Sequence, residues 1–286
     1  MINKLLGLIF LFSFTSLFAQ TTAIPDTNFE QKLITLGIDT NGANGNILNS
    51  DALAVTTLTL TGNTITNLTG LEAFVNVVTL NLGNNQFTTV PLSTLTSLES
   101  FQFSGNSVIS TLDFSQNILL KTVNISANNT SNTTAPLASL DFTNNINLVS
   151  LRIQQYGNLT NLVFPSTPTL TKIDLTYLGD PTLNFSQISN LEELIIVQSA
   201  VPVVITLPNV QTNLKKIGIY QISIPTIDLS MYSNLVGVNL NDTAVQNLLL
   251  PNSTTLTQIS VYGHNLQTTT SFTGLPNLQE LQILQN

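Results

Sequence analysis

The sequence predicts an α/β solenoid, in which short repeats stack into one parallel sheet and a small helical cap precedes the first repeat. Three observations predict this fold. An apolar pattern returns about every 21–23 residues over most of the 286-residue chain. Charged residues make up only 8% of the chain, and polar neutral residues such as Thr and Asn replace them, as in extracellular β-rich scaffolds. Helix and turn signals precede the first repeat.

Each predicted repeat contains a strand with the pattern L-x-x-L-x-L-x-x-N. In the first repeat, Val55, Leu58 and Leu60 fill the apolar positions and Asn63 follows. The middle apolar position recurs at Leu58, Leu80, Phe101, Val123, Leu151, Ile173, Leu194, Ile217, Val238, Ile259 and Leu281. An apolar residue stands three positions before and two positions after each of them, which makes 33 apolar positions. With 42% hydrophobic residues, chance would produce this pattern with a probability of about 10⁻¹².

The alternation in L-x-L predicts one short strand per repeat, with its leucines pointing inward. No repeat can bury that face alone, so about eleven units over residues 55–286 should stack, with the sheet on the concave face. The Asn of the motif should turn inward and bond to backbone groups of the bend. This position holds Asn63, Asn85, Asn106 and Asn128, and later Tyr156, Leu178, Ser199, Ile222 and Thr243.

The return path of each unit predicts short extended or 3-10 segments on the convex face. They begin at Leu112, Leu140, Leu162, Leu183, Ile227 and Leu248. We expect Phe114, Phe142, Phe164 and Phe185 to stack as one column, with a cofactor-binding aromatic box as the alternative. One spacing of 28 marks an Asn/Thr-rich insertion at residues 128–136, which is either a functional loop or a tolerated insertion.

Residues 1–19 have the composition of a signal peptide. Lys4 provides the positive charge, the residues from Leu5 to Phe14 are apolar, and Ala19 precedes the expected new terminus at Gln20. A membrane anchor or a buried strand is the alternative interpretation. After cleavage, six basic and fifteen acidic residues leave a net charge of −9, which argues against a nucleic-acid partner. The chain has no Cys, which excludes a lipoprotein anchor, disulfides and thiolate metal sites.

Residues 20–54 are predicted to form the N-terminal cap. Thr27 and Glu30 have the spacing of a capping box, and Phe29, Leu33 and Leu36 form a helical stripe that can cover the first strand.

An Asn/Gly-rich loop after this helix resembles an EF-hand calcium loop with one extra residue. The predicted ligands are the side chains of Asp39, Asn41 and Asn44, the carbonyl of Asn46, and Asp51 in place of the bidentate Glu. The alternative is a turn that needs no metal. We expect no other cofactor.

The repeats resemble the leucine-rich-repeat family over residues 55–286. Residues 24–30 and 36–39 look like the cap of secreted leucine-rich-repeat proteins of the Bacteroidetes, and the segment from Leu112 to Leu120 is similar to their repeats. The resemblance implies an exported, internalin-like surface protein used for adhesion or recognition. Many such proteins carry a C-terminal sorting domain, whereas this chain stops at Asn286 inside its eleventh unit.

The concave face is the default binding surface of a solenoid. Its outward positions are neutral in the first four units and become charged and aromatic later. The candidate ligand-binding residues are Arg152, Lys172, Asp174, Tyr177, Glu193, Lys216, Tyr220 and Tyr262. The alternative is a solvated face with scattered charges.

Little in the sequence favours catalysis. His264 is the single His, and it stands at the Asn position of the tenth unit, where a hydrogen-bonded turn residue is expected. The residues Asp242, Thr243 and Ala244 resemble the three-residue O-glycosylation signal known in the Bacteroidetes, and the resemblance implies a glycan on Thr243. Leu278, Leu281 and Ile283 belong to a strand that no later unit covers, so we expect truncation, fraying or end-to-end self-association there.

These features predict a non-catalytic protein, secreted or at the cell surface, that presents its concave face to a protein or glycan. It should have no membrane span once the signal peptide is removed. A structural surface or matrix protein without a defined ligand is the alternative function.

Overall fold

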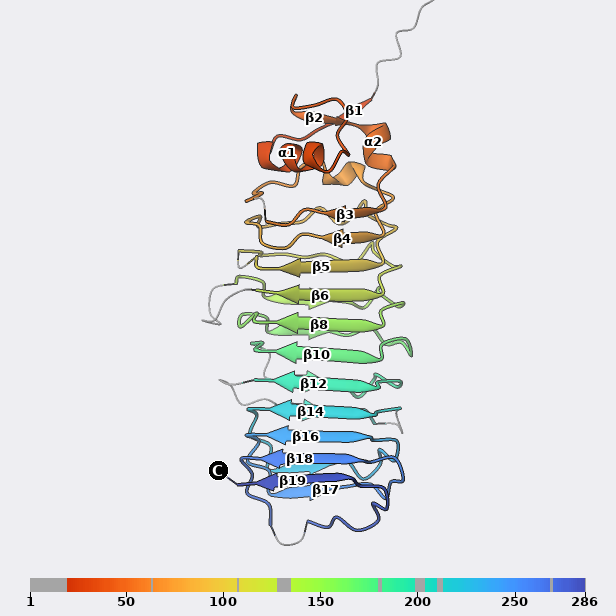
Figure 1. The fold of residues 1–286 in the computed structure, drawn as a ribbon, viewed down its shortest axis with the longest axis vertical. Coiled ribbons are helices and arrows are strands. Elements are labelled where there is room, and N and C mark those ends of the chain that lie inside the picture. The colour runs from red at the N-terminus through yellow and green to blue at the C-terminus, as the bar shows by residue number, and fades with distance from the viewer. Residues whose placement is uncertain are drawn as a thin grey trace, which may run out of the picture.

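A computed structural model describes residues 20–62, 64–106, 108–127, 135–179, 182–198, 204–209, 213–267 and 270–285. The predicted signal peptide and most of the predicted insertion at 128–136 therefore lie outside the described residues. The described chain forms the predicted solenoid, with the strands of one parallel sheet stacked along its length (Figure 1).

Eleven strands of the described chain form this sheet in their order along the sequence. They are β3 (Thr57–Thr59), β4 (Thr79–Asn81), β5 (Ser100–Ser104), β6 (Thr122–Ser126), β8 (Ser150–Gln154), β10 (Lys172–Thr176), β12 (Glu193–Val197), β14 (Lys216–Tyr220), β16 (Gly237–Asn241), β18 (Gln258–Tyr262) and β19 (Glu280–Leu284). The register pairs the middle apolar residue of each unit with that of the next, as Leu58 with Leu80 and Ile217 with Val238. These residues are buried in ten strands, whereas Leu281 of β19 is 46% exposed.

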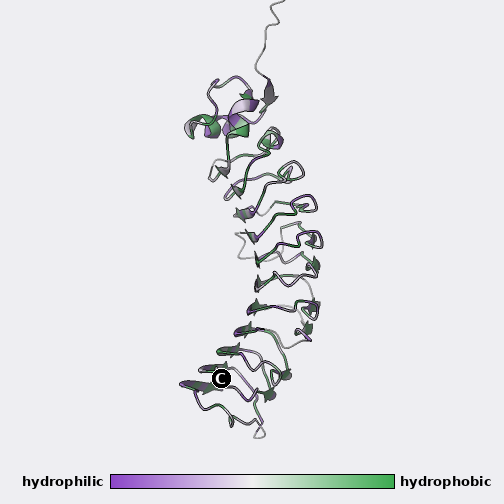
Figure 2. Ribbon diagram, turned by 90° about the vertical axis from the view of Figure 1, so that its right-hand side faces the viewer, coloured by the Kyte–Doolittle hydropathy of each residue, from purple (hydrophilic) through white to green (hydrophobic). Residues whose placement is uncertain are grey.

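The sheet lines the inner side of an arc, and the return segments lie on the outer side (Figure 2). Three two-stranded parallel ladders form there: β7 (Ser139–Asp141) with β9 (Asn161–Val163), β11 (Thr182–Asn184) with β13 (Val204–Thr206), and β15 (Thr226–Asp228) with β17 (Asn247–Leu249). The predicted segment at Leu112 is not a strand, although Leu112 and Phe114 are buried. The strand β13 was not predicted, although Ile205 and Leu207 have the same spacing as Ile227 and Leu229 of the predicted segment that forms β15.

The convex phenylalanines form two pairs and not the single column that we expected. The rings of Phe114 and Phe142 stack with centroids 5.5 Å apart, and those of Phe164 and Phe185 are tilted at 5.3 Å. Phe164 is only partly buried, whereas Phe114, Phe142 and Phe185 are buried. The rings fill the core between sheet and return path, since Phe114 also contacts Phe101 of β5.

The two described asparagines at the inward position, Asn85 and Asn106, bond to backbone groups of the bend as predicted. Asn106 is fully buried, and its amide nitrogen donates to the carbonyls of Leu82 and Ser104. Its oxygen accepts from the backbone N–H of Asn85, whose own oxygen accepts from Ile65 N–H. Asn63 and Asn128 lie outside the described residues, as does Ser199. In that later unit the buried side chain of Gln198 bonds to the backbone instead. Its Oε1 accepts from the N–H of Leu178, and its Nε2 donates to the carbonyl of Leu178.

The N-terminal cap consists of α1 (Thr27–Thr35), α2 (Asn49–Leu53) and the antiparallel pair of β1 (Thr21–Ala23) and β2 (Asn46–Leu48), followed by the 3-10 helix η1 (Leu71–Ala73). The predicted helix is confirmed, with Phe29 and Leu33 buried. The predicted capping box is wrong. Asp26 caps α1, and the carboxylate of Glu30 turns away to accept from the N–H groups of Asn44 and Gly45.

Candidate binding surface on the concave face

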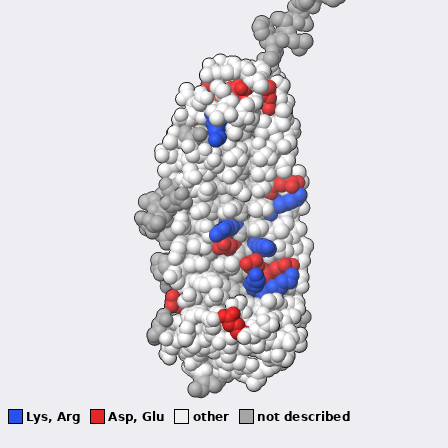
Figure 3. Space-filling view, in the orientation of Figure 1, with Lys and Arg blue, Asp and Glu red and all other residues white. Residues whose placement is uncertain are grey.

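The strands of the sheet display three rows of outward side chains, because residues at the first, third and fifth positions of each strand point away from the core. The side chains are neutral over β3 to β6. Figure 3 views this face and shows the charged side chains of the strands gathered farther along it. The candidate surface is therefore the part of the concave face formed by β8 to β18.

The structure brings most of the predicted residues together. Arg152 of β8 forms an ion pair with Asp174 of β10, with 3.1 Å between Nε and Oδ2. Lys172, Glu193 and Lys216 open three successive strands and lie beside one another in register. These charges alternate across the sheet, so the surface presents both signs over a short distance.

Tyr220 is the central aromatic residue of this surface. Its ring lies across Gly218, because a Cβ atom added to Gly218 would stand 2.8 Å from Cε2 of the ring. Gly218 is thus the residue that lets a large ring lie flat on the sheet. Burial raises the pKa of the Tyr220 hydroxyl, so this group is neutral and can donate or accept a hydrogen bond at neutral pH.

Two hollows flank Tyr220. The first has a volume of about 210 Å³ and is lined by Glu193, Ile195, Lys216, Gly218, Tyr220, Asn239 and neighbouring residues of β14 to β18. The second has a volume of about 400 Å³ and is lined by Gln154, Asp174, Thr176, Tyr177, Ile195, Val197, Tyr220, Gln221, Asn241 and Asp242. Both hollows mix carboxylate, amide and apolar groups, which suits a ligand with polar and apolar parts.

The other two predicted tyrosines have different roles. Tyr177 borders the second hollow, and its hydroxyl donates to Gln221 Oε1 at 3.1 Å, which joins β10 to the end of β14. Tyr262 of β18 bonds to Gln282 of β19 and lines neither hollow. Its ring therefore lies outside the central part of the surface.

Sequence reasoning missed the apolar floor of the surface. Ile195 and Val197 occupy outward positions of β12 and are partly exposed, and Ile195 lines both hollows. The signal was present, since the run Leu194–Val197 is apolar throughout and breaks the alternation of the other strands. Gly218 gave no comparable signal, because its role depends on where the Tyr220 ring lies.

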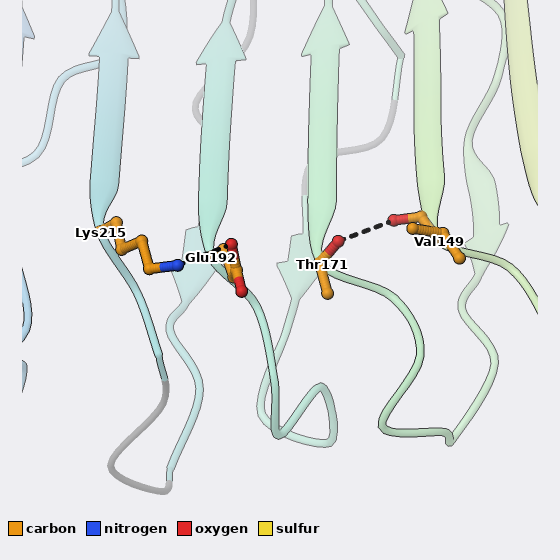
Figure 4. A network of polar contacts seen from close by, with 4 residues as sticks. All are labelled: Val149, Thr171, Glu192 and Lys215. Carbon is orange, nitrogen blue, oxygen red and sulfur yellow. Dashed lines mark hydrogen bonds and ion pairs between the residues drawn. The ribbon is translucent and has the colours of Figure 1, made fainter.

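A further row of residues stands just before each strand, at the edge where the chain enters the sheet. Lys215 pairs with Glu192 at 3.0 Å, and in the same row Thr171 donates to the carbonyl of Val149 (Figure 4). Lys121 and Glu99 form a similar pair at 2.8 Å. All four charged side chains are about 36–53% exposed, so these pairs contribute little to stability and mainly shape the edge of the surface.

The predicted calcium ligands lie in one loop between α1 and β2 and at the start of α2. Asn44 Oδ1 accepts from Asn46 N–H, and Asp51 Oδ2 accepts from the backbone and hydroxyl of Thr40. Asp39 Oδ2 and Asn41 Oδ1 are buried without a hydrogen-bond partner in the described structure. The described residues contain no group of three or more His, Cys, Asp or Glu side chains able to hold a metal.

Two other predicted positions are also described. Nδ1 of His264 accepts from Leu266 N–H at 3.0 Å, as expected of a turn residue. Thr243 is only 1% exposed, and its hydroxyl has no hydrogen-bond partner in the described structure. A glycan on this hydroxyl would have to be attached before the chain folds, so the modification stays a prediction.

The stacked parallel strands, the inward asparagines and the curved sheet define the leucine-rich-repeat fold. The chain is similar to the crystal structure of the internalin InlF of Listeria monocytogenes, with a TM-score of 0.56 and 15% identity over 91% of this chain and 76% of that one. Internalin C2 of the same organism gives a TM-score of 0.49 and 17% identity over 93% of this chain and 98% of that one.

No known family profile matches the chain, and no curated protein is significantly similar to it in sequence. At these identities the structural likeness concerns the fold. In the part of the chain that the structure describes, no helix is long and apolar enough to cross a membrane.

Proposed function

We propose that the chain is an exported, non-catalytic binding module whose concave face around Tyr220 takes a protein or glycan ligand. The observation that carries this proposal is the pair of hollows on either side of the Tyr220 ring. Aromatic and Arg side chains are the usual anchors of protein interfaces. The ring also offers a flat face next to hydrogen-bonding groups of both signs, which a sugar ring or a peptide can use.

The similarity to internalin InlF supports a binding module at the level of the fold, and the sequence of residues 1–19 supports export. The hollows are lined by Glu193, Lys216, Asp174 and Asp242 as well as by neutral Thr, Asn and Gln side chains. This mixture favours a ligand recognised by hydrogen bonds and apolar contact over one with a large net charge.

An unbiased screen of residues 20–286 against glycans and cell-surface proteins would identify ligands, and two variants would then locate the site. We expect Tyr220→Ala and Arg152→Ala each to weaken binding at least about tenfold, because each removes an interface anchor. The matched control is Gln102→Ala on β5, which is exposed on the neutral part of the same face and should leave affinity unchanged.

Gly218→Ala tests the position of the ring without removing it. The added methyl group would collide with Tyr220 and push the ring out of its place between the hollows. Affinity should fall while the melting temperature changes little, because the ring is a partly exposed side chain that can swing aside. If Gly218→Ala, Tyr220→Ala and Gln102→Ala all bind the ligand equally, the site lies elsewhere. Self-association without any ligand would favour the structural alternative.

A further inference from the structure

The cap loop contains a buried carboxylate oxygen that lacks a partner. Asp39 is 5% exposed, and its Oδ2 is the one carboxylate oxygen of the described residues that is both buried and without a hydrogen-bond donor. Oδ1 of Asn41, two residues later, is also buried and has no hydrogen-bond donor among the described residues. Buried oxygens of this kind are costly unless a donor or a cation satisfies them. Two of them in one short loop therefore indicate a ligand.

Hydrogen bonds from several sides hold this loop in shape. Asp39 Oδ1 accepts from Asn41 N–H at 3.1 Å. Glu30 of α1 accepts from the N–H groups of Asn44 and Gly45 at 2.8 and 2.5 Å. Asp51 of α2 accepts from Thr40 N–H at 3.0 Å and from its hydroxyl at 2.7 Å. The oxygens without partners are thus already in place before a ligand arrives, which lowers the entropic cost of binding.

Negative charge accumulates here without a matching cation. Glu30, Asp39 and Asp51 all belong to this part of the cap, and Glu30 is 5% exposed. The three ion pairs found among the described residues lie elsewhere on the molecule. A bound cation would relieve the repulsion between these carboxylates and satisfy the free oxygens at once.

We propose that the loop of residues 39–51 binds one calcium ion through Asp39 and Asn41. Calcium accepts carboxylate, amide and carbonyl oxygens together and tolerates irregular geometry, whereas magnesium needs near-ideal octahedral coordination and gives up water reluctantly. Zinc favours Cys and His, and the loop contains neither. Waters and the carboxylate of Asp51 complete the coordination. With so few charged ligands, the affinity should lie in the range of extracellular modules, about 10⁻⁴–10⁻³ M.

Calorimetric titration of residues 20–286 with CaCl2 tests this proposal. We expect one ion to bind with a dissociation constant near the millimolar range, and MgCl2 at the same concentrations to bind at least tenfold more weakly. Hydrogen exchange read by mass spectrometry supplies a local signal, because 10 mM calcium should slow exchange in peptides covering residues 39–48 relative to chelator. The melting temperature should rise by about 3 °C.

Variants of the loop distinguish a calcium site from a well-packed turn that binds no metal. Asp39→Asn should abolish calcium binding, whereas Asp141→Asn should retain it, since Asp141 also accepts the N–H two residues later but lies in β7. Should Asp39→Asn fold poorly, Asn44→Asp adds a carboxylate at an exposed position and should tighten binding several-fold. The proposal is overturned if calcium produces no heat and no local protection, or if Asn44→Asp leaves the affinity unchanged.

Discussion

At the scale of single residues, two buried tyrosines replace small polar residues at bends of the solenoid. The hydroxyl of one has a hydrogen-bond partner in the described structure, and the hydroxyl of the other has none. Tyr232 is 1% exposed and donates its hydroxyl hydrogen bond to the carbonyl of Pro208 at 2.7 Å. Tyr156 stands at the inward Asn position, is fully buried, and its hydroxyl has no partner in the described structure. Burial raises the pKa of both hydroxyls, that of Tyr232 to about 12 with a contribution from Asp228.

Removal of each hydroxyl should therefore change stability differently. Tyr232→Phe leaves the Pro208 carbonyl without its donor and should lower the free energy of unfolding by about 1–2 kcal/mol, whereas Tyr156→Phe should be neutral or stabilising. Urea unfolding of both variants measures this, and equal losses would contradict it. Because the folded-state pKa of Tyr232 is raised, its contribution is complete below about pH 10 and disappears as pH rises through about 12.

At the scale of elements, Asp26 joins the cap to the first repeat. Its Oδ1 accepts from the N–H groups of Asn28 and Phe29 at the start of α1. Its Oδ2 accepts from Thr66 N–H at 2.8 Å, from the Thr66 hydroxyl and from Asn67 N–H at 2.9 Å. Burial would raise the pKa of Asp26, but the hydrogen bonds, led by that from Thr66, lower it overall.

Asp26→Asn should loosen the cap. The single amide oxygen can accept either from the N–H groups at the start of α1 or from those of Thr66 and Asn67, and the amide NH2 group would then face the other set of donors. We expect a loss of about 2–3 kcal/mol in the free energy of unfolding of the cap. Asp113→Asn is the control, since Asp113 accepts only the exposed Ser115 N–H in the described contacts. Hydrogen exchange of residues 27–35 reports the effect, and equal exchange in both variants would contradict it.

The same contact predicts a pH dependence. A carboxylate with a lowered pKa stabilises the fold above its unfolded-state pKa of about 3.9. This contribution is lost as pH falls through the lower folded-state value. The protection of the cap amides, measured relative to their intrinsic exchange rate at each pH, should therefore fall when pH drops below about 4, and Asp26→Asn should remove that part of the dependence.

At the scale of the whole molecule, burial differs between the two ends of the described sheet. The first strand, β3, lies beneath the cap, and Leu58 is fully buried. In β19, Leu281 and Leu284 are 46% and 56% exposed. Because each unit of a solenoid gains stability mainly from its neighbours, a protein of residues 20–286 should be least protected near β19.

We expect this protein to self-associate through β19. Replacing Leu281 and Leu284 by Ser should shift sedimentation toward the monomer at high concentration. Ile118→Ser provides the control, because Ile118 is 53% exposed but lies on a bend away from the strand edges. A parent protein that stays monomeric at every concentration, or that loses association equally with Ile118→Ser, would contradict this interpretation.

The sequence by itself determined the repeat, the register of the eleven described strands and nearly all of the inward residues. Period-two alternation within a strand and a period near 22 between strands are local properties, so they can be counted along the chain. The regular spacing also assigns Arg152, Asp174 and Tyr220 to one face of the sheet, because all three stand at outward positions of their strands.

Only the tertiary structure decided which of those outward residues meet. The ring of Tyr220 settles over Gly218, Gln198 takes the place expected for Ser199, and Glu30 bonds the cap loop instead of closing a capping box. Each outcome depends on side-chain rotamers and on neighbours from adjacent turns or elements, which a pattern of apolar spacings does not encode. The hollows beside Tyr220 emerge only when the turns are stacked. The oxygens without partners in the cap loop emerge only when the loop packs against α1 and α2.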